Sequence, residues 1–208
     1  SIPILDKQAK RIFSVTCRGR IDSMTTDQIY VHQDYDLRFL ARHSELLRHY
    51  RSIVERGRTP LIVDCGANIG LSARYFATEF QLAHVRAFEP DPGNYEAALA
   101  NCRGLPKISI INHAIGCHPG EVVISDEQKD SNALRTVRDG DGPKIQVSTL
   151  NDILERGEKD DLEPFIVKID IEGFEKDLFS ANTEWVRKIP LIIICLLYTS
   201  DAADDCRC

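Results

Sequence analysis

Hydrophobic and polar positions in this chain switch between strand-like and helix-like spacing from residue 61 onward. Short apolar runs closed by turns predict buried strands, and apolar positions three or four residues apart predict amphipathic helices. This pattern predicts strands at 61–64, 84–88, 108–112, 165–169 and 191–194, and helices at 71–80, 94–102, 149–156 and 172–181. Runs rich in β-branched residues predict two more strands, at 121–125 and 144–147, around a polar loop. The alternation predicts an α/β fold with a mostly parallel sheet and helices on both faces.

The first 57 residues carry a weaker pattern. Residues 27–31 predict a short strand, and residues 44–56 predict a helix with Ser44 as its N-cap and Gly57 as its stop. No repeat or low-complexity linker divides the chain. We therefore expect one domain at 58–194, preceded by an N-terminal extension at 1–57.

The last residues differ in character from the rest of the chain. From Cys195 onward the sequence reads CLLYTSDAADDCRC, which resembles a translated sequencing adaptor joined to a truncated reading frame. Residues 199–208 show no apolar periodicity and predict no strand. We therefore expect residues 195–208 to be a non-native tail, and the last strands of the sheet to be missing after Ile194.

Composition and charge narrow the possible partners. The chain has 32 acidic and 26 basic residues, for a net charge of −6, and this disfavours a nucleic-acid partner. No apolar run approaches the roughly 20 residues that span a bilayer, so no membrane span is predicted. Neither a signal peptide nor cysteines at metal-ligand spacing are recognisable, which favours a reducing cytoplasm and no metal site. The sequence carries no signal for the oligomeric state.

The strongest chemical motif is VDCGANIG at residues 63–70. Gly66 allows a sharp turn close to a ligand, and Gly70 allows the following helix to pack closely. Asp64 stands where a dinucleotide-binding G-x-G-x-x-G motif has its first glycine. A carboxylate there would repel a pyrophosphate but would hold an amino group through charge-assisted hydrogen bonds. The motif therefore favours S-adenosylmethionine, which has an ammonium group and no phosphate, over NAD.

Two further groups of residues follow predicted strands. Glu89, in AFEPDP, lies about 20 residues after the glycine turn, where nucleotide-binding sheets present an acid to the ribose hydroxyls. Ala114 is small and follows the next strand, where the adenine edge is expected. In KIDIEGFE, at residues 168–175, Asp170 and Glu172 are candidates for acid–base work or for binding a cation.

The segments VDCGANIG, AFEPDP, VSTLNDIL and IVKIDIEGFEKDLF resemble, in order and spacing, the FkbM family of methyltransferases over residues 62–194. The resemblance implies a Rossmann-like fold, S-adenosylmethionine as cofactor, and O-methylation of a hydroxyl group on a sugar or secondary metabolite. The acceptor would be a small molecule or a glycan, and the N-terminal extension would help to shape its pocket. By position the resemblance assigns Asp64, Gly66, Asn68 and Gly70 to the methionine end of the cofactor, Glu89 to the ribose, and Asp170 with Glu172 to the reaction centre.

Methyl transfer to a hydroxyl needs a positioned acceptor oxygen and a group that takes its proton. Asp170 is the first candidate for this base, Glu172 the second and His113 the third, and Lys168 would counter their charge or orient the acceptor. A Mg²⁺ ion held by Asp170 and Glu172 is an alternative, but no further oxygen ligand is identifiable. Two other functions stay open: an NAD-dependent oxidoreductase on the same sheet, and a non-catalytic binding module.

Overall fold

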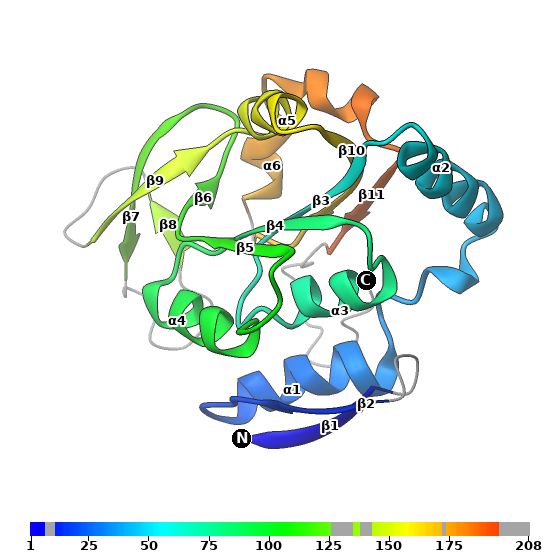
Figure 1. Ribbon diagram of the computed structural model, residues 1–208. Helices are drawn as coiled ribbons and strands as arrows, with labels where there is room; N and C mark the ends of the chain where they lie inside the picture. The colour runs from blue at the N-terminus through cyan, green and yellow to red at the C-terminus, as the bar shows by residue number, and fades with distance from the viewer. Residues whose placement is uncertain (7–10, 126–134, 138–142, 172–173, 196–208) are drawn as a thin grey trace.

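Five parallel strands form the central sheet of the computed structural model, which describes residues 1–6, 11–125, 135–137, 143–171 and 174–195 (Figure 1). Their order is β11–β10–β3–β4–β5, and each neighbouring pair is parallel. Each strand overlaps an apolar run of the sequence, so the predicted Rossmann-like α/β fold is confirmed. The bounds are β3 (Thr59–Cys65), β4 (His84–Phe88), β5 (Ile108–Ile111), β10 (Leu162–Ile169) and β11 (Leu191–Ile194).

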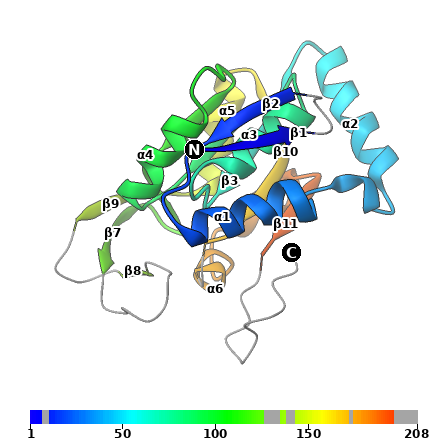
Figure 2. The same ribbon diagram turned by 90° about the horizontal axis from the view of Figure 1, so that it is seen from below.

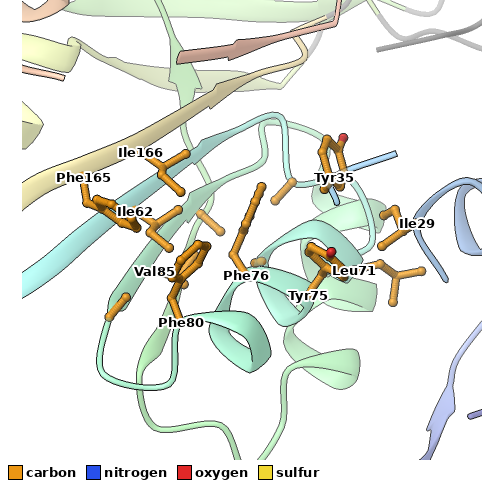
Figure 3. Close-up of a cluster of buried hydrophobic side chains, with 14 of the residues drawn as sticks. Ile29, Tyr35, Ile62, Leu71, Tyr75, Phe76, Phe80, Val85, Phe165 and Ile166 are labelled. Carbon is orange, nitrogen blue, oxygen red and sulfur yellow. The ribbon is translucent and has the colours of Figure 1, made fainter. Parts of the chain in front are cut away.

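Helices cover both faces of this sheet because successive strand residues point to opposite sides. Ile62 packs with Phe76 of α3 (Leu71–Glu79), and Ala97 of α4 (Pro92–Asn101) belongs to the same cluster. Figure 3 shows this first core, with Phe76 and its neighbours gathered against the strands. Val63 instead packs in a second core with Leu154 of α5 (Leu150–Lys159), as well as with residues of the 3₁₀ helix η3 (Thr183–Lys188).

A second sheet lies beyond the end of β5. It contains β6 (Ala114–Ile115), β7 (Gly120–Ser125), β8 (Arg135–Val137) and β9 (Lys144–Ser148) in the order β6–β9–β7–β8. The predicted strands at 121–125 and 144–147 are confirmed, and they pair with each other antiparallel. Thr149 is the N-cap of α5, because its side chain accepts a hydrogen bond from the backbone N–H of Asp152.

The N-terminal region packs on the α3 side of the central sheet, as both views show (Figures 1 and 2). It consists of the antiparallel pair β1 (Ile2–Asp6) and β2 (Arg11–Val15), followed by α1 (Arg20–Asp27), the π-helix η1 (Gln28–His32), the 3₁₀ helix η2 (Leu37–Phe39) and α2 (His43–Glu55). Its buried residues join the first core, including Val15, Ile29 and Ile53.

Two local predictions for the N-terminal region are wrong. Residues 27–31 are helical rather than a strand, because Ile29 is buried against the core around α3 and this packing outweighs its β propensity (Figure 3). The N-cap of α2 is Arg42 rather than Ser44, because a turn from Leu40 to His43 leads the chain into the helix earlier. Gly57 does follow α2 with a positive φ of 77°.

The helix expected at 172–181 is much shorter than predicted. Within the described residues it is α6 (Glu175–Leu178), and the chain then turns through Asn182, which has a positive φ of 53°. Residues 172, 173 and 196–208 lie outside the described residues, so the expected tail is described only at Cys195. The boundaries at 57 and 194, and the missing strands, stay predictions. No helix in the described part of the chain is long and apolar enough to cross a membrane.

Candidate functional site

The carboxyl ends of β3, β4 and β10 meet the residues after β5 in one cleft. Ligands of open α/β sheets bind at this edge, because the loops that follow parallel strands meet there. Six of the residues considered from the sequence line the cleft: Gly66, Asn68, Glu89, His113, Ala114 and Asp170. The structure thus brings together side chains from four separate segments of the sequence.

Gly66 forms the turn after β3, and this turn touches the backbone after β10. Its φ is 87°, and a Cβ atom at this position would overlap the carbonyl oxygen of Asp170. The backbone N–H of Gly66 donates to the carbonyl of Phe88 (3.0 Å), and that of Asp170 donates to the carbonyl of Cys65 (2.9 Å). A residue without a side chain is therefore required where the three strand ends converge.

Glu89 is a buried carboxyl group inside the cleft, with 6% of its surface exposed. Its Oε2 accepts a hydrogen bond from the backbone N–H of Asn68 (2.7 Å), and its Oε1 accepts one from the backbone N–H of Asp91 (3.0 Å). Burial raises the pKa of Glu89 to about 7, although these two backbone hydrogen bonds act in the opposite direction. Near neutral pH the carboxyl group of Glu89 is therefore partly ionised, and its ionised form can accept hydrogen bonds from ligand hydroxyls.

Asp64 and Lys168 form a buried ion pair beneath the cleft. They are register partners on β3 and β10, so their side chains lie next to each other on the α3 face. Their exposed fractions are 0% and 2%, and the distance from Lys168 Nζ to Asp64 Oδ1 is 3.0 Å. Ser72 at the start of α3 donates a hydrogen bond to Asp64 Oδ2 (2.6 Å). Neither Asp64 nor Lys168 lines the cleft: the structure places both beneath it, whereas the sequence predicts Asp64 at the methionine end of the cofactor and Lys168 either countering the charge of the acids or orienting the acceptor.

Lys168 connects the two turns at the base of the cleft. Its Nζ donates a hydrogen bond to the carbonyl of Gly66 (2.7 Å) and lies 3.6 Å from Oδ2 of Asp170. Burial alone would lower the pKa of Lys168, but the carboxylates of Asp64 and Asp170 raise it well above the ordinary value. The lysine is therefore a charged group that holds the turns, and its own ammonium does not reach the cleft.

The remaining predicted site residues are placed as follows. Asp170 lines the cleft with 32% of its side chain exposed. Nδ1 of His113 lies 2.8 Å from the hydroxyl of Ser148, and burial lowers the pKa of this histidine. Gly70 packs α3 against Ala98 of α4 and does not line the cleft. Glu172 lies outside the described residues, and within the described part no group of His, Cys, Asp or Glu is arranged to hold a metal.

The N-terminal region contributes lining residues that the sequence did not indicate. Arg18, Ile21 and Asp22, around the start of α1, line the same cleft. The guanidinium of Arg18 binds Asp22 through Nε (2.9 Å) and binds the side chain of Asn94 through Nη2 (2.6 Å). The only signal in the sequence was an Arg and an Asp four residues apart, a spacing too common to point to a site.

Three comparisons with known proteins each match this chain to a methyltransferase. The family model "Methyltransferase FkbM domain" matches residues 64–202. The hexuronic acid methyltransferase AglP of Haloferax volcanii is 25% identical over 132 residues, which are 63% of this chain and 53% of AglP, so the chain spans about half the length of that relative. A crystal structure of methyltransferase FkbM from Methylobacillus flagellatus matches with a TM-score of 0.38 and 22% identity, covering 58% of this chain and 28% of that one.

Proposed function

We propose, from the premise that the chain belongs to the FkbM methyltransferase family, that its cleft binds S-adenosylmethionine and that it methylates a hydroxyl oxygen. The family supports methyl transfer, and the contents of the cleft support the cofactor. AglP is described as acting on a hexuronic acid, which supports a sugar as the acceptor here. A hydroxyl of a secondary metabolite is the alternative acceptor that the resemblance implies.

The observation that carries the proposal is the acidic lining of the cleft. Its lining includes the carboxyl groups of Asp22, Glu89, Asp91 and Asp170 and the single guanidinium of Arg18. Asp22 pairs with Arg18, and the ammonium of Lys168 beneath the cleft is shared between Asp64 and Asp170, so the net charge of the site is negative. A negative site attracts a ligand that carries sulfonium and ammonium groups and repels a pyrophosphate. The lining therefore fits S-adenosylmethionine and disfavours NAD.

Individual residues fit separate parts of this cofactor. The carboxyl of Glu89 would accept hydrogen bonds from the ribose hydroxyls, and the small side chain of Ala114 leaves room for the adenine ring. Gly66 and Asn68 bring their backbone close to the methionine end. Asp64 would act indirectly, through the ion pair that holds the turn of Gly66.

The cofactor, when bound, supplies a methyl group activated by the sulfonium. Asp170 is the residue we propose to accept the proton of the acceptor hydroxyl, because it is the carboxylate at the end of β10 and is open to the cleft. The backbone contact with Gly66 and the nearby ammonium of Lys168 fix its place. Glu172 and His113 stay the second and third candidates for this base.

Calorimetric titration of S-adenosylmethionine and of NAD⁺ into the purified, folded chain tests the cofactor. We expect S-adenosylmethionine alone to bind, and Glu89→Gln to weaken it roughly 10- to 100-fold, as expected for hydrogen bonds to a charged group. Glu96→Gln, on the exposed side of α4, is the matched control and should leave the affinity unchanged. Binding of NAD⁺ instead, or of neither ligand by a folded sample, would overturn the proposal.

A further inference from the structure

The start of α1 is tied to the cleft through one arginine. Arg18 lies just before this helix, and its backbone N–H and its Nε both donate to Oδ2 of Asp22, at 2.8 and 2.9 Å. Its Nη2 donates to Oδ1 of Asp22 (3.1 Å) and to Oδ1 of Asn94 (2.6 Å). Asp22 is buried, with 4% of its surface exposed, so it is a fixed anchor for the guanidinium.

Asn94 passes this contact on to Glu89. While its Oδ1 accepts from Arg18, its Nδ2 lies 3.5 Å from Oε1 of Glu89, at the limit of a hydrogen bond. The backbone N–H of Asn94 donates to the side chain of Asp91, which caps α4. The amide of Asn94 is therefore oriented from both sides: its oxygen faces α1 and its nitrogen faces the carboxyl group in the cleft.

We propose that Arg18 is a positioning residue that acts through Asn94 to hold the carboxyl of Glu89 in place for its ligand. The inference rests on the proposed function, since the ligand in question is the ribose of the cofactor. Without Arg18 the side-chain amide of Asn94 is free to turn over and to present its oxygen to the carboxylate of Glu89. The N-terminal region then belongs to the cofactor site as well as to the acceptor side.

Arginine suits this role because its planar guanidinium reaches two partners at once. Lysine carries the same charge on a single nitrogen and cannot hold Asp22 and Asn94 in the same fork. If Arg18 only stabilised the packing of α1 against α4, any favourable contact between the two helices could replace it. The positioning role predicts in addition that the effect of Arg18 depends on Glu89.

A double-mutant cycle with S-adenosylmethionine tests this dependence by calorimetry. We expect Arg18→Met to raise Kd by roughly 3- to 10-fold, the effect of about one net hydrogen bond, and Arg18→Lys to restore it only in part. In the Glu89→Gln background the same Arg18→Met change should alter Kd by less than about 2-fold, because the two residues act in one chain of contacts. Arg20→Met, an exposed arginine on α1, is the matched control. An unchanged Kd for Arg18→Met, or equal effects in both backgrounds, would overturn the proposal.

A readout without the cofactor separates this inference from the proposed function. The charged or titratable side chains that line the cleft with Glu89 are Arg18, Asp22, Asp91, His113 and Asp170. Of these, Arg18 is the one cation that reaches Asn94, so its removal should raise the pKa of Glu89, whereas Arg20→Met should not. Carbon NMR titration of the glutamate carboxyl groups measures this, with the Glu89 signal identified by its loss in Glu89→Gln. If the wild type binds no S-adenosylmethionine, the proposed function fails while this titration still decides whether Arg18 positions Glu89; an unchanged pKa would refute it.

Discussion

Replacing Lys168 with methionine removes the ammonium group beneath the cleft and keeps a long apolar side chain in its place. Asp64 is then a fully buried carboxylate whose remaining hydrogen bond comes from Ser72. Among the described residues its Oδ1 has no hydrogen bond of regular geometry, so the ion pair with Lys168 is what compensates the charge there. Removing one partner of a buried ion pair leaves an uncompensated charge and costs about 3–5 kcal/mol.

This cost is a large fraction of the total stability of a domain, which is about 5–15 kcal/mol. For a chain of this size each kcal/mol moves Tm by about 2–4 °C, so Lys168→Met should lower Tm by about 6–20 °C. Thermal and urea unfolding followed by circular dichroism measure the change. Lys176→Met is the matched control, because this lysine is exposed on α6, and it should stay within about 0.5 kcal/mol of the wild type.

A second variant separates the lost charge from the altered packing. Asp64→Asn combined with Lys168→Met removes both charges, so it should be more stable than Lys168→Met alone even though it carries one more substitution. If Lys168→Met cost less than about 1 kcal/mol, or if the double variant were less stable than the single one, the pair would not be the buried ion pair described here.

Three further outcomes follow from the cleft. Because the pKa of Glu89 is raised to about 7 and the ionised form accepts hydrogen bonds best, affinity for S-adenosylmethionine should rise about 10-fold between about pH 6 and pH 8. Calorimetry across this range checks it, and a flat profile in the wild type would contradict it. Gly66→Ala should destabilise the fold by about 3 kcal/mol or more in urea unfolding, since its Cβ would overlap the backbone of Asp170, whereas Gly19→Ala meets open space and should be tolerated. Asp170→Asn should lower kcat by about 100- to 10,000-fold in a methyl-transfer assay while the Kd for S-adenosylmethionine changes less than about 2-fold; full turnover would remove Asp170 as the base.

Local patterns predict the central sheet well, because each buried parallel strand is a short apolar run closed by a turn. They also place Glu89 in the cleft, since the carboxyl ends of parallel strands share one edge. The strand predicted at 27–31 is wrong because the helical conformation there depends on packing against α3 rather than on the local residues. The correct predictions, the strands of the central sheet and the place of Glu89, depend on patterns within a few neighbouring residues.

Contacts between distant segments could not be predicted in this way. That Asp64 faces Lys168 depends on the register between β3 and β10, which no local pattern specifies. The contact of Arg18 with Asn94 joins residues 76 positions apart and depends on how α1 lies against α4. The sequence could therefore identify the acids of the site, but it could not tell which of them line the cleft and which lie beneath it and hold the turns.

The hydrogen bond from Lys168 to Gly66 also has a consequence for the order of events in folding. It joins residues 102 positions apart, across the two neighbouring strands at the middle of the sheet. Pairing of such distant segments pays a high loop-closure entropy and tends to come late. During synthesis the glycine turn leaves the ribosome long before its partner strand exists. The cleft is therefore formed only when β10 docks, so ligand binding by a newly made chain would report that β10 has joined the sheet.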